Sequence, residues 1–332
     1  MVAELRDGGY CLYPDPAADP CSPGIIKAHT VQKKGGLAAI AEAGHVLTVK
    51  ATMKDMIETQ GRPQPRDIGV NQASIFPGFC SKHDTSLFKA IEGKSLALTK
   101  ENAFLLAFRA IAYERFAKEA QLRSTEIQRE SDRGHPFWKQ AIVQSHLATF
   151  RAGIEIGMRD IDRWNGLFDA RFISGMRDDF HFAAFRFDQV LPIVACAAFH
   201  PEFDMDGKRL QKLGRDASDF EHMSLTVTVF AGQTIAVFGW TGADDGASRA
   251  LADSFTRVDD VQKADALVRL LFAQTDNLFL RPSWWRALPD STKRTLSAMV
   301  LSGTTLQPRS GAQLASGPII LSGVTVAEAA SG

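Results

Sequence analysis

A Cys-x-x-His pair, Cys80 and His83, is the feature that most constrains how this chain can fold. Two ligands three residues apart can bind one zinc ion from a single turn, and zinc prefers four such ligands in a tetrahedron. Cys11 and Cys21 lie upstream in loops rich in proline and glycine, and they are the natural other half of the set. The sequence therefore predicts a structural zinc site. The spacing from Cys11 to Cys21 exceeds that of a Cys-x-x-Cys knuckle, so two reduced, unpaired cysteines are the alternative.

Composition limits the compartment and the partners. The chain has 332 residues, four cysteines and a formal net charge of zero. So few cysteines do not suggest a disulfide framework, and a neutral chain needs a local basic patch to contact nucleic acid. No segment reaches the roughly 18 consecutive apolar residues that a membrane-spanning helix requires, and the N-terminus does not resemble a signal peptide. We therefore expect a cytoplasmic protein that does not bind membranes.

Apolar patterns and turn residues predict an α+β fold in four parts. The first part is dense in glycine and proline, with short strands over 24–29 and 45–49 and a helical turn over 37–43. The four parts are a zinc-binding module (1–99), a long antiparallel helical hairpin (100–170), an α+β domain (171–305) and a flexible tail (306–332).

The hairpin is predicted from helical spacing and from a break. Thr99 can cap a helix that runs to about Arg133, and Gly134-His135-Pro136 ends it before a second apolar stripe begins. Helices of about 30 residues each would extend on the order of 45 Å. Because such a stripe needs a partner, we expect either a homodimer through the hairpin or packing on the C-terminal domain.

The C-terminal domain is predicted to contain an antiparallel sheet. Apolar residues change to an alternating pattern from about Asp178, and Ala231-Gly232-Gln233 is typical of a tight hairpin turn. Strands are expected over 180–187, 191–199, 225–230 and 234–240, with helices over 260–272 and 291–301 on one face.

Two short motifs carry a resemblance to a known family. The run from Ile26 to Thr30 (IKAHT), followed by the run from Cys80 to Phe88 (CSKHDTSLF), resembles the HNH endonuclease pattern. It is similar to the subgroup that places Ala-x-His before a loop and Cys-x-x-His-Asp at the start of the closing helix. The match covers roughly residues 11–90. It implies a treble-clef fold with a ββα element.

The resemblance also implies a chemistry. It makes His29 the general base that activates water, and it makes Asp84 a ligand of a catalytic Mg²⁺ or Mn²⁺ ion. The family has an asparagine about five residues before the Cys-x-x-His knuckle, where this chain has Ile75, and Asn71 is out of step. A zinc ligand or a structural histidine is the alternative for His29.

Basic residues of the same region are candidates for phosphate contacts. Lys27, Lys33, Lys34 and Lys82 are the predicted substrate-binding residues. Acidic residues are almost as frequent nearby, so a solvated mixed surface is the alternative.

The resemblance thus implies a metal-dependent nuclease, with DNA favoured over RNA as substrate. A bacterial defence or toxin-type effector with a C-terminal sensing or assembly domain would suit this arrangement. The alternative is a non-catalytic, dimerising zinc protein that binds or regulates a partner.

Overall fold

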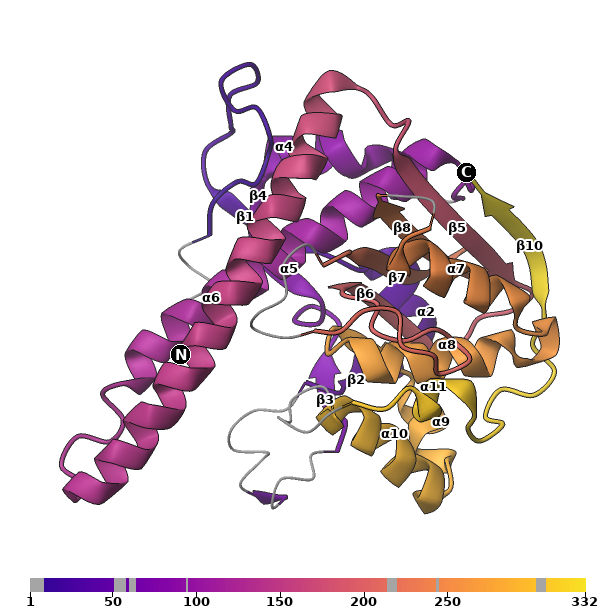
Figure 1. Cartoon of the computed structure of the whole chain (residues 1–332). Helices are drawn as coiled ribbons and strands as arrows, with labels where there is room; N and C mark the ends of the chain where they lie inside the picture. The colour runs from indigo at the N-terminus through magenta and orange to yellow at the C-terminus, as the bar shows by residue number, and fades with distance from the viewer. Residues whose placement is uncertain are drawn as a thin grey trace.

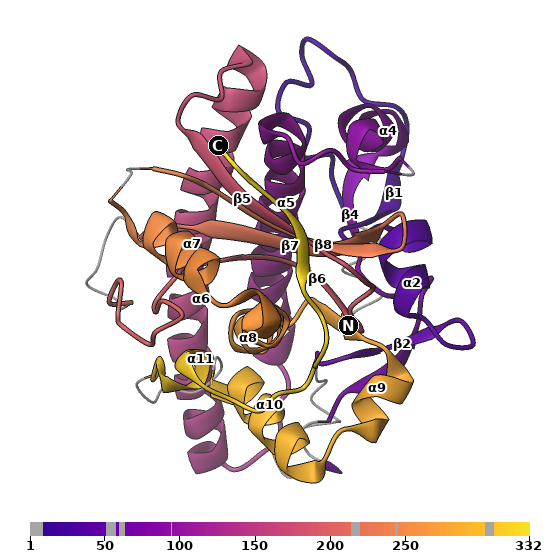
Figure 2. The same ribbon diagram turned by 90° about the vertical axis from the view of Figure 1, so that its right-hand side faces the viewer.

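An antiparallel sheet of eight strands, covered by helices on both faces, forms the centre of the molecule (Figures 1 and 2). The computed structural model describes residues 9–50, 58–59, 64–93, 95–213, 220–242, 245–302 and 309–332. The strand order is β10-β5-β8-β7-β6-β9-β2-β3. These strands are β2 (His45–Thr48), β3 (Arg66–Gly69), β5 (Phe180–Phe187), β6 (Ile193–Phe199), β7 (Met223–Phe230), β8 (Gln233–Thr241), β9 (Leu278–Leu280) and β10 (Val326–Ser331).

Alternation along β5 explains why both faces of the sheet are covered. Phe182 belongs to the apolar core on one face, whereas Phe185 and Phe187 belong to the core on the other. Successive side chains of a strand point to opposite faces, so a strand that is apolar throughout needs packing on both. The turn between β7 and β8 is the predicted one, since Ala231 and Gly232 both have positive φ.

One face carries the long hairpin of α5 (Lys100–Gln128) and α6 (Phe137–Ser174). Thr99 caps α5 as expected, because its side chain accepts a hydrogen bond from the Asn102 backbone N–H at 3.3 Å. The 38 residues of α6 give a helix of about 57 Å, which projects beyond the sheet (Figure 1). Buried residues of its stripe, such as Ile161 and Phe168, pack in the same core as α5 and the sheet. The C-terminal half of this stripe therefore packs within the chain, whereas Phe150 nearer the start of α6 is exposed.

The other face carries most of the C-terminal helices. Helices α7, α8 and α10 pack in the core on this face through Leu251, Leu267 and Leu296, respectively. The helices of this part of the chain are α7 (Ala247–Arg257), α8 (Asp260–Gln274), α9 (Pro282–Ala287), α10 (Asp290–Ser302) and α11 (Ala312–Ala315).

A smaller unit from the N-terminal region packs against α5. Strands β1 (Ile25–His29) and β4 (Ile75–Cys80) form an antiparallel pair, and α4 (Ser81–Phe88) and the short helix η2 (Lys89–Ile91) follow β4 directly. Between β1 and β2 lie a π-helical turn, η1 (Lys33–Leu37), and one turn of α-helix, α2 (Ala38–Ile40). The order β1, β4, α4 is a ββα unit.

Two expectations about organisation differ from the structure. Residues within 1–99 supply β2 and β3 to the large sheet, where β2 pairs with β9. The tail expected to be flexible contributes β10, which pairs with β5 at the sheet edge. The two helices expected on one face, α8 and α10, pack in one core, and the hairpin packs on the other face, which is one of the two partners expected for it. The overall fold class is mixed α/β, with an antiparallel sheet in the C-terminal part of the chain.

Among the helices of the described residues, we find none that is long and apolar enough to cross a bilayer.

Candidate metal centre and its surroundings

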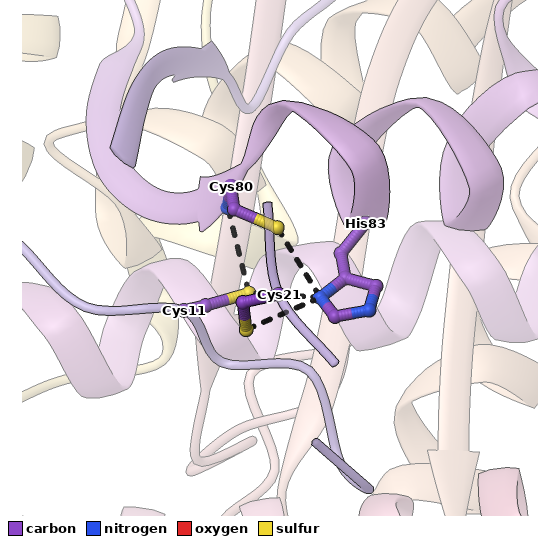
Figure 3. A group of neighbouring side chains, drawn as sticks. All are labelled: Cys11, Cys21, Cys80 and His83. Carbon is purple, nitrogen blue, oxygen red and sulfur yellow. Dashed lines mark hydrogen bonds between the residues drawn. The ribbon is translucent and has the colours of Figure 1, made fainter. Parts of the chain in front are cut away.

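Four side chains from two segments meet at the start of α4. Cys80 ends β4 and occupies the N-cap position of α4, and His83 lies in the first turn of that helix. Cys11 and Cys21 come from the long loop that precedes β1. The three sulfur atoms surround one ring nitrogen of His83 (Figure 3). The sequence-based prediction that these four residues come together is in accord with the structure.

The distances fit a tetrahedral metal site. His83 Nδ1 lies 3.3 Å from the sulfurs of Cys11 and Cys80 and 3.6 Å from that of Cys21. Bonds of about 2.3 Å from zinc to sulfur and about 2.0 Å from zinc to nitrogen give nitrogen-to-sulfur edges of about 3.5 Å in a tetrahedron. All four ligand atoms lie within 4.8 Å of one another. The cluster can hold a metal ion.

A second set of contacts orients His83. Its Nε2 lies 3.3 Å from Asp19 Oδ2, and the ring of Tyr13 stacks on the imidazole at 3.8 Å. Asp19 in turn pairs with Lys82, whose Nζ also donates to the Pro20 carbonyl at 2.9 Å. The approach of Asp19 is electrostatic, because Nε2 makes no hydrogen bond of regular geometry to the described residues, and a carboxylate at this place raises the basicity of the ring toward a metal. Lys82, a predicted substrate-binding residue, joins α4 through these contacts to the loop that carries Cys21.

The thiols of the cluster differ in acidity. Burial opposes ionisation of Cys80, but hydrogen bonds from Ser22 and from the His83 backbone lower the pKa of its thiol to about 6. Burial raises the pKa of the Cys11 thiol to about 11. Metals bind thiolates, so metal binding at this cluster releases protons from the thiols.

His29 ends β1 and is half-buried. Burial lowers the pKa of its imidazole; a hydrogen bond to the Val70 backbone raises that pKa, and Lys33 and Arg109 lower it. Its Nε2 is buried, and none of the described residues hydrogen-bonds to it. His29 therefore lies outside the Cys/His cluster, and burial favours the neutral form of its ring.

Asp84 lies in the first turn of α4, beside His83, and is also half-buried. Burial raises the pKa of its carboxyl group, Arg109 lowers it and Glu92 raises it. The same two charges act on His29. Asp84 and His29 therefore share the electrostatic field of one ion pair, formed between Arg109 on α5 and Glu92 after η2.

A polar cluster next to His29 in the chain could not be predicted from local patterns. Ser74 adopts φ 58°, its hydroxyl contacts that of Thr30, and its backbone carbonyl accepts from the Thr30 N–H at 2.9 Å. Thr30 also accepts from Asn277 of the large sheet region at 3.0 Å. Ile75, which occupies the place of the family's asparagine, pairs with His29 across the two strands. A left-handed serine and a partner about 250 positions away leave no local pattern in a sequence.

The remaining lysine candidates are on the surface. Lys27, Lys33 and Lys34 are exposed, and within the described residues none of them pairs with a carboxylate. Their side chains are available to phosphate groups. No contact to a substrate is implied by exposure alone.

In the part of the chain that the structure describes, the Cys/His cluster is the one group of three or more His, Cys, Asp or Glu side chains close enough to hold a metal ion. His29 and Asp84 are not part of a second such group. Comparison of the chain with protein families, with curated proteins and with solved structures found no match.

Proposed function

We propose that the Cys/His cluster binds a structural zinc ion and that the adjoining ββα unit is the active site of an HNH-like endonuclease. The observation that carries the nuclease proposal is the order β1, β4, α4, with His29 at the end of β1 and Asp84 in the first turn of α4. A zinc ion at the junction of β4 and α4 would hold the two reactive side chains in place. A set of three thiolates and one imidazole binds zinc in preference to magnesium or calcium.

His29 suits the role of general base. An imidazole that stays neutral near pH 7 can accept a proton from water, and burial favours the neutral form here. The nitrogen without a hydrogen-bond partner is the atom that would accept it. The resulting hydroxide would attack a phosphodiester bond of the nucleic acid.

Asp84 suits a divalent ion that reaches the site together with the substrate. A single carboxylate at the start of a helix leaves most of the coordination sphere to water and phosphate oxygens, which is the usual arrangement for Mg²⁺. The ion would neutralise negative charge that develops on the phosphate. Lys27, Lys33 and Lys34 would contact neighbouring phosphates, and DNA is the favoured substrate.

Cleavage of a plasmid and of a single-stranded RNA tests this proposal. Wild type, His29→Ala and Asp84→Asn are compared with Mg²⁺, with Mn²⁺ and with EDTA, and His45→Ala is the matched control because His45 is exposed at the start of β2. We expect metal-dependent cleavage that His29→Ala abolishes and His45→Ala retains. Equal cleavage by wild type and His29→Ala would assign the activity to another site or to a contaminant.

A second function is favoured by Ile75, which pairs with His29 in the place where the HNH family has an asparagine. On that basis the zinc serves folding alone, and the chain binds or regulates a partner without catalysis. Folded, zinc-loaded wild type that cleaves neither nucleic acid with either metal would support this function over the nuclease.

A further inference from the structure

An arginine outside the ββα unit contacts the closing helix of that unit and the residue that follows η2. Arg109 is in the middle of α5 and only 3% exposed, and its guanidinium carbon lies 3.9 Å above the ring centre of Phe88 at the end of α4. Its Nη2 donates to Glu92 Oε1 at 2.6 Å, while its Nε is buried and has no partner among the described residues. A buried charge is costly unless it is paired, so the ion pair with Glu92 is needed to keep Arg109 charged at this buried position.

Glu92 connects the pair to the outside. Its side chain is 37% exposed and lines a cavity of about 590 Å³ together with Lys34 and Gln32. The Gln32 amide donates to the Glu92 backbone carbonyl at 2.8 Å, which joins the residue after η2 to the segment that follows His29. An unpaired carboxylate at this place would repel a phosphate backbone, and Arg109 neutralises it.

We propose that the Arg109–Glu92 ion pair is a positioning element of the cleavage site, which packs the closing helix on α5 and sets the charge around His29. This inference rests on the proposed function. The contacts that carry it are the stacking of Arg109 on Phe88, its ion pair with Glu92 and the link from Glu92 to Gln32. Arg109 and Glu92 lie outside both motifs of the HNH resemblance.

The two charges act on His29 with opposite signs, which gives a sharp test. The charged groups that influence His29 are Lys33 from η1, Arg109 from α5 and Glu92 after η2. Loss of the positive charge in Arg109→Met favours the imidazolium and should raise the pKa of His29. Loss of the negative charge in Glu92→Gln should lower that pKa. The opposite directions of the two shifts are the expected result.

The experiment is an NMR titration of the histidine ring signals, with the His29 signal among eight histidines assigned by its loss in His29→Gln. Arg109→Lys keeps the charge and should leave the pKa near that of wild type, and the double variant Arg109→Met/Glu92→Gln should return it there. Glu328→Gln, which breaks an exposed Arg–Glu pair at the sheet edge, is the matched control and should have no effect. In a cleaving protein, the acidic limb of the pH profile should move with the His29 pKa.

Shifts of the same sign in both variants, or none in either, would overturn the inference and leave the pair a packing element. If Arg109→Met does not fold, the His29 pKa in Glu92→Gln alone decides the test. Glutamine at this half-exposed position keeps a hydrogen-bond acceptor, so this variant is expected to fold. The titration needs no cleavage. If wild type does not cleave but the two variants shift the His29 pKa in opposite directions, the nuclease proposal fails and the electrostatic role of the pair stands. If wild type cleaves but neither variant shifts that pKa, the electrostatic role fails and the nuclease proposal stands.

Discussion

At the scale of single residues, Asp19 is the side chain that most directly supports the metal centre. Asp19→Asn removes the negative charge behind His83 and weakens the pair with Lys82. Loss of a carboxylate behind a metal-binding histidine usually costs about 10- to 100-fold in metal affinity. We expect faster zinc loss to a chelator from this variant, with little change in folding at saturating zinc.

The matched control is Asp15→Asn in the same loop. Asp15 accepts a hydrogen bond from the Ala18 backbone N–H at 3.0 Å, which an asparagine can still accept. Zinc loss at the wild-type rate from Asp19→Asn, measured with a chromophoric chelator, would show that Asp19 does not orient the ligand.

Two buried or half-buried histidines in ring contact predict acid sensitivity of the fold. The rings of His200 and His222 lie 3.9 Å apart, and His222 also contacts the edge of Trp164. Burial lowers the pKa of both rings, and Lys118 adds to this effect at each; Asp160 acts in the opposite sense on His200. Other contributions at His200 come from the Glu221 backbone, which raises its pKa, and Arg309, which lowers it.

Stability should fall with pH because the unfolded chain binds more protons than the folded chain. In the unfolded chain these histidines take up protons below about pH 6.5, whereas in the folded chain they stay neutral, so stability is lost as the pH falls below that value. Between about pH 7.5 and about pH 5.5 the melting temperature should therefore fall less in His222→Phe than in wild type. His135→Phe, at an exposed position in the hairpin loop, should behave like wild type. An equal fall in all three proteins would contradict the prediction.

Some residues of the candidate site could be predicted from the sequence, and others could not. The four metal ligands were predictable because thiols and imidazoles in a Cys-x-x-His turn have few other common uses. Arg109 and Ser74 were not, since an arginine within an apolar helix and a serine in a loop carry no spacing signal. Their roles depend on which distant elements pack against them.

At the scale of elements, the close contact of α5 with the sheet depends on a glycine in β8. A Cβ atom at Gly239 would lie 2.9 Å from Ser224 Oγ, 3.0 Å from Phe180 Cζ and 3.1 Å from Ala107 Cβ of α5. Gly239→Ala should therefore destabilise the protein by about 1–3 kcal/mol through overpacking. The measurement is chemical denaturation, with Gly69→Ala of β3 as control.

Gly69 is also a strand glycine, but a Cβ there meets no atom within 4 Å. Its substitution should change the free energy of unfolding by much less. Equal costs at the two positions would mean that α5 can move away from the sheet without penalty.

The elements themselves were largely predictable, and their partners were not. Helical spacing and the Thr99 cap predicted α5, and alternating aromatics predicted β5. The three residues of β9 and the alanine-rich β10 escaped prediction, because neither has enough apolar alternation to stand out. Both segments form strands because they pair with strands that are distant in the sequence, and local patterns do not encode such pairing.

At the scale of the whole molecule, the N-terminal region depends on the rest of the chain. Phe76 and Phe79 of β4 contact Tyr113 and Phe108 of α5, with ring centres 5.6 and 6.5 Å apart. Strand β2 pairs with β9 across more than two hundred residues of sequence. We therefore predict that a fragment of residues 1–99 does not fold, even with zinc. A dispersed amide NMR spectrum of the zinc-loaded fragment would contradict this.

Zinc is the premise that the nuclease and the non-catalytic alternative share. The most direct test is X-ray absorption at the zinc edge, with metal analysis, on the full chain purified without added metal. We predict one zinc ion per chain bound by three sulfurs at about 2.3 Å and one nitrogen at about 2.0 Å, and its loss in Cys80→Ser. A folded wild-type chain without zinc, or zinc bound mainly by oxygen, would contradict the account.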